Sequence, residues 1–146
     1  MALLQNKKAF FDYEILQKFE AGIELLGFEV KSLKKGEGSL AGAFVIVRGN
    51  EAFVTNMNIP PYQVKNTPAD YDPMRPRKLL LTKKEIEEIG EIEQQKGLTI
   101  IPLSVYNKGG KLKMEIGAAR GKKKFDKRES IKKRDTDREI RKQLKA

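Results

Sequence analysis

The sequence contains no cysteine and no histidine among its 146 residues. Without cysteine it cannot form a disulfide, a thiolate metal site or a cysteine nucleophile, and it suits a reducing compartment. Without histidine, the usual zinc sites and the Ser–His and Cys–His catalytic arrangements cannot be assembled. No Walker-type loop or spaced-glycine fingerprint indicates a phosphate or dinucleotide site. We therefore expect no catalytic residue, no metal site and no cofactor.

Long apolar segments are also lacking. No run of about 18 apolar residues could cross a membrane, and residues 1–8 lack the apolar stretch of a secretory signal. These features predict a cytoplasmic protein. Apolar residues make up 39% of the chain, enough for one domain with a modest core and an extension.

Acidic residues are scarce at one end of the chain, so its net charge of +10 is unevenly distributed. Residues 1–119 carry 17 basic and 15 acidic side chains, whereas residues 120–146 carry 13 basic and 5 acidic ones. This excess predicts a polyanionic partner, with nucleic acid as the first candidate. An anionic membrane is the weakest alternative, because the apolar face of the tail is too thin for insertion.

Residues 120–146 contain too few large apolar side chains to offset the entropy of ordering, so we predict a tail that is disordered when free. Lys, Arg, Glu and Gln dominate after Ser130, which could cap a helix once a partner holds the tail. Pairs such as Asp137 and Arg141 have the spacing that supports a helix. A solubilising tail without a defined partner remains the alternative.

Residues 1–119 show mainly strand patterns. Strands are predicted for residues 13–25, 43–47, 52–57, 99–106 and 111–118, with a hairpin turn at residues 48–51. Gly22, inside the first strand, suggests a bulge or a bend.

Two helices are predicted between these strands. Residues 27–36 have helical spacing and end at Gly36, and residues 83–96 follow a capping box that begins at Thr82. Five or six antiparallel strands with two or three short helices favour a mainly β fold, a small antiparallel β-barrel of the oligonucleotide-binding type. The Phe and Tyr residues fall in strand patterns and are interpreted as core.

Six strings, in this order and spacing, make the chain resemble the SmpB family of transfer-messenger RNA (tmRNA)-binding proteins from about residue 6 to residue 142. They are Asn6-Lys7-Lys8-Ala9, Phe19-Glu20-Ala21-Gly22-Ile23, Gly27-Phe28-Glu29-Val30-Lys31-Ser32-Leu33, Pro76-Arg77-Lys78-Leu79-Leu80-Leu81, Gly97-Leu98-Thr99 through Val105-Tyr106, and Ala119-Arg120-Gly121-Lys122-Lys123 with Phe125-Asp126-Lys127-Arg128-Glu129.

The resemblance implies a bacterial protein whose barrel binds the tRNA-like part of tmRNA. It implies that the tail becomes helical in the empty decoding site and messenger channel of a stalled ribosome, against small-subunit ribosomal RNA. It further implies a monomer that does no chemistry itself, and delivery by an elongation factor that carries the charged RNA.

The resemblance also implies two sets of contact residues. The tmRNA set is Asn6, Glu20, Leu80 and Lys113. The ribosome set is Gly121, Lys122, Lys123, Phe125, Asp126, Lys127 and Arg128. In the first set, strand alternation turns Lys113 away from the apolar face, and Leu80 could instead belong to the core.

Within the second set, Gly121 suits a flexible joint between barrel and tail. Phe125 stands where relatives often carry His or Tyr, so it can stack on a base but cannot donate a hydrogen bond.

Two other functions fit the charge pattern less well. A structural ribosomal protein could bind ribosomal RNA permanently through the basic tail. A metal-dependent nuclease would need carboxylates such as Glu20 or Glu29.

Overall fold

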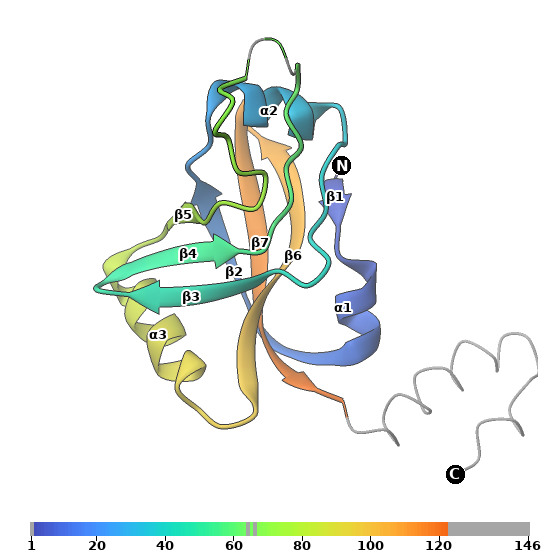
Figure 1. Cartoon of the computed structure of the whole chain (residues 1–146). Helices are drawn as coiled ribbons and strands as arrows, with labels where there is room; N and C mark the ends of the chain where they lie inside the picture. The colour runs from blue at the N-terminus through green and yellow to red at the C-terminus, as the bar shows by residue number, and fades with distance from the viewer. Residues whose placement is uncertain (1, 64, 66, 123–146) are drawn as a thin grey trace, which may run out of the picture.

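The computed structural model describes residues 2–122 with the exception of residues 64 and 66 (Figure 1). In this part of the chain, seven strands and three helices follow one another. They are β1 Ala2–Gln5, α1 Lys7–Asp12, β2 Tyr13–Ile23, α2 Gly27–Lys34, β3 Phe44–Arg48, β4 Glu51–Thr55, β5 Arg77–Leu80, α3 Lys83–Glu93, β6 Leu98–Lys108 and β7 Lys111–Gly121.

The strands form an antiparallel barrel. Six of them close a ring in the order β6, β3, β4, β5, β2 and β7, with β7 returning to β6, and β1 extends one edge of β6. The ring is narrow at one seam, where β3 meets β6 through the single pair Val45 and Ile100. There α3 packs against both strands, and the Glu93 carboxylate accepts a hydrogen bond of 3.2 Å from the Val47 amide. The helix therefore covers the seam where the sheet is weakest.

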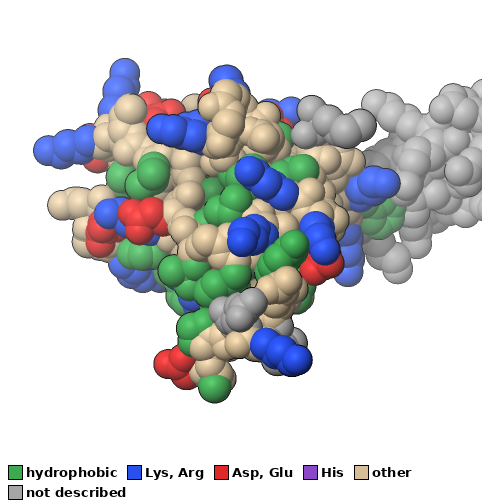
Figure 2. Space-filling model, turned by 90° about the horizontal axis from the view of Figure 1, so that it is seen from above, with side chains coloured by type: hydrophobic (Ala, Val, Ile, Leu, Met, Phe, Trp, Pro, Cys, Tyr) green, Lys and Arg blue, Asp and Glu red, His purple; other side chains and the backbone are tan. Residues whose placement is uncertain are grey.

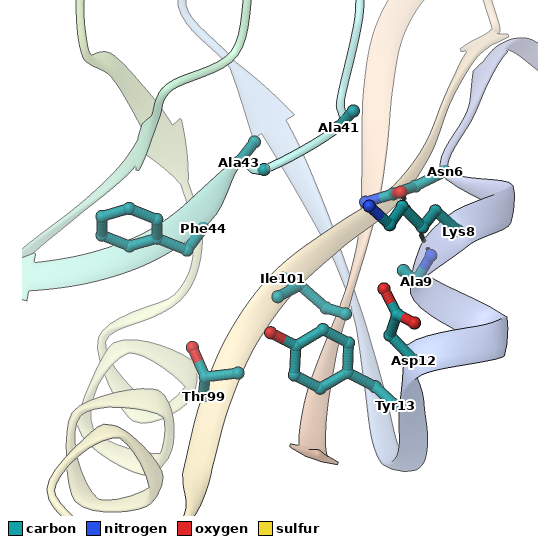
Figure 3. A pocket seen from close by; sticks show the side chains of 11 residues that line it. Asn6, Lys8, Ala9, Asp12, Tyr13, Ala41, Ala43, Phe44, Thr99 and Ile101 are labelled. Atoms are coloured by element: carbon teal, nitrogen blue, oxygen red, sulfur yellow. Dashed lines mark hydrogen bonds between the residues drawn. The ribbon is translucent and has the colours of Figure 1, made fainter. Parts of the chain in front are cut away.

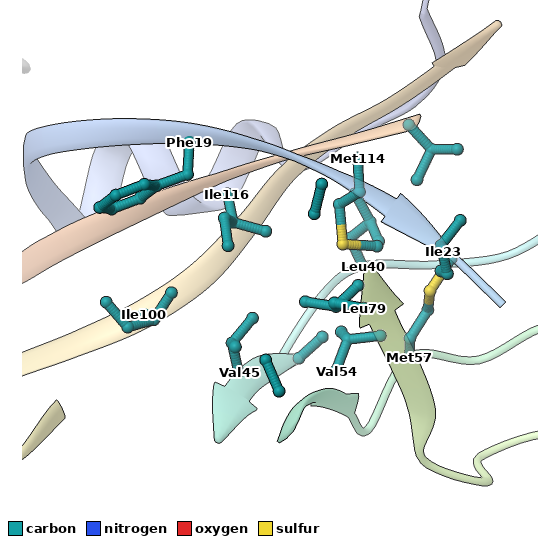
Figure 4. Packing of buried hydrophobic residues seen from close by; sticks show 14 of the residues in the cluster. Phe19, Ile23, Leu40, Val45, Val54, Met57, Leu79, Ile100, Met114 and Ile116 are labelled. Carbon is teal, nitrogen blue, oxygen red and sulfur yellow. The ribbon is translucent and has the colours of Figure 1, made fainter. Parts of the chain in front are cut away.

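The core lies inside the ring. Inward side chains from all sides meet there, including Phe19, Ile100, Met114 and Ile116 (Figure 4). Leu33 of α2 is fully buried and joins this cluster from the end of the barrel that α2 covers (Figure 1). The barrel is thus a packed core with no channel for a ligand through its centre.

A second, smaller cluster lies on the outer surface of the barrel. Ala9 of α1 packs there with Ile101, Leu103 and Ala119, which alternate with the inward residues of β6 and β7. One side of α1 therefore holds this helix against the wall of the barrel, close to the end of β7.

Most predicted elements are confirmed. The β3–β4 hairpin turns at Gly49 and Asn50, both with positive φ, and the capping box of α3 forms between Thr82 and Glu85. Gly36 has a positive φ of 77° after α2, as expected for a helix terminator. The mainly β barrel is the predicted fold class.

Three elements were not predicted: β1, α1 and β5. The expected bulge at Gly22 is wrong, because the irregularity in β2 lies between Ile15 and Gln17. The interpretation of the aromatic residues as core is also wrong, since among the described Phe and Tyr side chains only Phe19 is buried. In residues 2–122, leaving aside 64 and 66, no helix is long and apolar enough to cross a bilayer.

Candidate nucleic-acid interface

Three of the four residues expected to contact tmRNA meet on one outer face of the barrel. Gly22 in β2 lies in register with Leu80 of β5 on one side and with Lys113 of β7 on the other. Glu20 precedes Gly22 by two residues and therefore points to the same face of β2. A side chain at Gly22 would lie 3.1 Å from the Leu80 Cβ, so the glycine leaves room for Leu80.

Glu20 is exposed and held by two partners on β6. The Tyr106 hydroxyl donates a hydrogen bond to its carboxylate, and the Lys108 Nζ lies 3.1 Å and 3.3 Å from its two oxygens. These hydrogen bonds and the nearby charges of Lys108 and Lys113 hold the pKa of Glu20 below its ordinary value. Burial, and then the hydrogen bond to Glu20, raise the pKa of Tyr106. Glu20 is therefore a fixed anion with lone pairs left for a donor on RNA.

Leu80 is an exposed residue, with 50% of its surface accessible. The alternative that it belongs to the core is wrong, because strand alternation places its neighbour Leu79 inside the barrel at 1% exposure. Leu80 also forms part of the wall of a shallow hollow of about 460 Å³ between β5 and the start of α3. Its apolar side chain is thus free to contact a base or a sugar.

Lys113 supplies the positive charge of this face. Its partner across β6 is Tyr106, so the ammonium group lies near the Glu20 network. Within the described part of the chain, Lys113 forms no ion pair. The ammonium group is therefore available to a phosphate.

Asn6 does not join this face. It is buried, and its amide Nδ2 donates to the backbone oxygens of Pro102 at 2.9 Å and Leu40 at 3.3 Å. Its Oδ1 accepts a hydrogen bond from the Ala9 amide at 3.3 Å and caps α1. Asn6 therefore fixes α1 against β6, and its amide hydrogens are not available to a ligand.

A hollow of about 280 Å³ opens beside Asn6, between α1, β6 and the segment that leads into β3 (Figure 3). Ile101 and Thr99 of β6 line it together with Tyr13 and the exposed Phe44. These aromatic groups at the surface, with polar groups around them, are the kind of lining that can receive an unpaired base.

The start of the ribosome-contacting set lies close to α1. Gly121 is the last residue of β7 and pairs with Tyr13, so the strand continues two residues beyond the expected boundary at residue 119. The backbone amide of Lys122 donates a hydrogen bond to the backbone oxygen of Asp12 at 2.9 Å. The Lys122 Nζ donates a hydrogen bond to the backbone oxygen of Phe10 at 3.2 Å. The backbone is therefore held to the barrel as far as Lys122, so Gly121 is not a flexible joint. Lys123, Phe125, Asp126, Lys127 and Arg128 lie outside the described residues.

A buried ionic cluster, which was not predicted from the sequence, joins α2 to β5. The Glu29 carboxylate is fully buried and accepts hydrogen bonds from Arg75 at 2.5 Å and from Arg77 at 2.6 Å. The Tyr71 hydroxyl donates to it at 2.9 Å. Burial alone would raise the pKa of Glu29, but the hydrogen bonds from Arg75, the Leu26 amide and Arg77 outweigh it and hold the pKa below its ordinary value.

The same cluster raises the pKa of Tyr71 to about 12, first through burial and then through its bond to Glu29. The only feature of the sequence that could have indicated this cluster is the position of Glu29 and Arg77 in two of the family strings. A carboxylate with two arginine partners is not a free metal ligand, and the described residues contain no group of acidic side chains that could hold a metal ion.

Comparisons with known proteins all give the same family. The family model described as SmpB protein matches residues 3–146. The SsrA-binding protein of Elusimicrobium minutum is 53% identical over 140 residues, which are 96% of this chain and 88% of that protein. The SsrA-binding protein of Mesoplasma florum is 54% identical over 138 residues, covering 94% and 93% of the two chains.

A solved structure described as "tmRNA-SmpB: a journey to the center of the bacterial ribosome" is also similar. Its chain is 46% identical, superimposes with a TM-score of 0.69, and the match covers 82% of this chain and 84% of that one.

Proposed function

Because the chain belongs to the SmpB family, we propose that it binds the tRNA-like part of tmRNA and promotes its delivery to stalled bacterial ribosomes for trans-translation. The observation that carries this proposal is the convergence of Glu20, Leu80 and Lys113 around Gly22. We call this surface the Gly22 face. It combines an anion, an apolar group and a cation on a rigid sheet.

Folded RNA is recognised mainly by its shape, through phosphates, 2′-hydroxyls and a few exposed bases. Lys113 suits a phosphate, and the Glu20 carboxylate suits a 2′-hydroxyl or the amino edge of a base. Leu80 suits the flat face of an unstacked base. Asn6 contributes indirectly, since it positions α1.

The second part of the proposal concerns the opposite end of the same strands. Gly22 pairs with Lys113, whereas Tyr13 pairs with Gly121 at the other end of the β2–β7 ladder. Nine residue-to-residue steps along β2 lead from Tyr13 to Gly22, about 30 Å at the usual rise. A chain that leaves the barrel after Lys122 therefore starts far from the Gly22 face, and it can reach a second partner while the first is bound.

We infer that residues 123–146 enter the empty decoding site and messenger channel. This segment has 11 basic and 5 acidic side chains, and the phosphates of small-subunit ribosomal RNA are its natural counter-charges. Lys123, Lys127 and Arg128 would bind phosphates, and Phe125 would stack on a base. Asp126 would accept a hydrogen bond, and Gly121 and Lys122 would fix the point of exit.

The remaining parts of the proposal rest on the membership of the SmpB family. The protein does no chemistry of its own, acts as a monomer in the bacterial cytoplasm, and needs no cofactor. An elongation factor carries the charged RNA together with it.

The direct test is to purify the protein from its own cells and to sequence the RNA that accompanies it. We expect tmRNA to be strongly enriched over ordinary tRNA. One copy of the protein on every ribosome, without tmRNA, would instead indicate a structural ribosomal protein.

A further inference from the structure

A second basic surface lies on α2, at the end of the barrel opposite the chain exit (Figure 1). Two ammonium groups of this helix lie over the ring of Tyr62, which belongs to the connection between β4 and β5. The Lys35 Nζ is 4.9 Å from the ring centroid and the Lys31 Nζ is 5.8 Å from it. We call Phe28, Lys31, Lys35 and Tyr62 the α2 clamp.

The clamp borders a hollow of about 270 Å³ between α2 and the connection. Gly27, Phe28, Lys31, Tyr62, Gln63 and Thr67 line it. Phe28 is braced by Tyr71, whose ring meets it edge to face at a centroid distance of 4.7 Å. The Tyr71 hydroxyl is in turn bonded to Glu29 and to the Ile59 oxygen, so this wall of the hollow is rigid.

Exposed lysines gather beside the hollow. Lys31, Lys34 and Lys35 are exposed on α2, whereas Glu29, the acidic residue of this helix, is buried and neutralised by two arginines. Figure 2 shows this end of the molecule, where Lys and Arg side chains and a smaller number of Asp and Glu side chains lie among hydrophobic groups. A polyanion that also offers a flat apolar group is the ligand that such a surface fits.

We propose that the α2 clamp binds an unpaired nucleotide of the tRNA-like part of tmRNA. The base stacks on Tyr62 at the hollow, and Lys31 and Lys35 bind the phosphates on either side. This inference rests on the proposed function. It assigns the clamp to tmRNA because α2 begins five residues after Gly22, within about 18 Å of extended chain, and because the exit point at Lys122 lies at the other end of the molecule.

The test measures binding to a transcript of the tRNA-like part of tmRNA and, separately, to small ribosomal subunits. The variants are Lys31→Ala/Lys35→Ala, Tyr62→Ala and Tyr62→Phe. Lys96→Ala is the control, because it removes an exposed lysine that lies between α3 and β6 and lines neither the hollow at α2 nor the hollow beside Leu80. Circular dichroism melting checks that each variant is folded.

We expect the double lysine variant to bind the transcript about tenfold more weakly and to reduce the slope of log affinity against log salt by about 1.5. Tyr62→Ala should weaken binding by about tenfold, and Tyr62→Phe should bind within about twofold of the wild type because the stacking ring remains. The control should behave like the wild type.

Unchanged transcript affinity in both Tyr62→Ala and the double lysine variant would overturn this inference. So would a loss confined to ribosomal subunits, which would assign the clamp to ribosomal RNA. If the wild type itself does not prefer the transcript to ordinary tRNA, the proposed function fails. In another outcome, the wild type prefers the transcript and Lys113→Ala weakens transcript binding, whereas the clamp variants bind as the wild type does. Only the inference about the α2 clamp is then wrong.

Discussion

Two glutamates of this chain occupy opposite surroundings. Glu20 is exposed, keeps its charge through Tyr106 and Lys108, and still faces solvent. Glu29 is buried, and Arg75 and Arg77 compensate its charge completely. The first arrangement leaves a carboxylate free to bind a ligand, whereas the second joins α2 to the strand β5 and contributes to stability.

Replacement of Glu29 should therefore affect stability. Glu29→Gln removes the charge that compensates two arginines, one of them fully buried, and we expect a loss of about 3–5 kcal/mol in the free energy of unfolding. The measurement is urea denaturation at neutral pH, with Glu37→Gln as a control at an exposed glutamate of the same region. A Glu29→Gln variant as stable as the control would contradict the role of the cluster.

The pH dependence of stability should change in the same variant. The pKa of Glu29 lies below its ordinary value of 4.5 in the folded protein. Its stabilising contribution is therefore complete above the unfolded pKa and is lost as the pH falls through the lower folded pKa. Below about pH 5, the stability of Glu29→Gln should fall less steeply than that of the wild type, as measured by thermal melting in a pH series.

Replacement of Lys113 should affect RNA affinity and leave stability unchanged, in contrast to replacement of Glu29. Lys113→Ala removes an outward ammonium group, so the melting temperature should stay unchanged while affinity for tmRNA falls about tenfold and the salt slope decreases by about 1. Filter binding at several salt concentrations measures the affinity and the salt slope, with Lys96→Ala, at another exposed lysine, as the control. If Lys113→Ala binds tmRNA as tightly as the wild type, Lys113 does not contribute to RNA binding by the Gly22 face.

At the scale of elements, α1 connects the barrel wall to the start of the tail. Its buried Ala9 packs on β6 and β7, Asn6 caps its first turn, and Lys122 is bonded to its last residues. A six-residue helix has little intrinsic stability. Tertiary contacts must therefore hold α1 in place, and Asn6 provides three of them.

The substitution Asn6→Ala should accordingly cost about 1–3 kcal/mol of stability, because it removes a helix cap and leaves the Pro102 and Leu40 oxygens without their donor. Asn6→Asp should be intermediate, since it keeps an acceptor for the cap and loses the donor. Thermal denaturation and RNA binding should be measured together. Loss of RNA affinity with unchanged stability would show instead that Asn6 touches the RNA.

The elements that sequence patterns predicted are those with a clear period or an end signal. The alternation of Leu112, Met114 and Ile116 and the capping box at Thr82 are local, so they can be read from short windows. The strands β1 and β5 have four residues each, too few for a period, and pairing with distant strands decides their conformation. Tertiary register likewise decides that Leu80 points outward and Leu79 inward.

The candidate interface was predictable to a similar extent. Glu20 lies in one of the family strings, the resemblance implied Lys113 as well, and strand alternation gave the outward direction of Lys113. The hydrogen bonds of Glu20 to Tyr106 and Lys108 could not be read from the sequence, because 86 and 88 residues separate the partners. The buried role of Asn6 was missed because its donors bind backbone oxygens that any residue could supply.

On the scale of the whole molecule, the β2–β7 ladder lies between the two regions to which we assign different partners. One end carries the Gly22 face and, beyond it, the α2 clamp. The other end carries α1 and Lys122, the last residue that the structure describes (Figure 1). Since the two ends lie about 30 Å apart along the strands, a large RNA can occupy one end without obstructing the other.

The most direct test of this account uses a chain that ends at Lys122. Its affinity for tmRNA should stay within about tenfold of the full-length value, because the Gly22 face is intact and only nonspecific phosphate contacts are lost. The same protein should fail to support tagging of stalled chains in a reconstituted translation system. Tagging at the full-length rate, or a truncated protein that no longer binds tmRNA, would contradict the separation of the two functions.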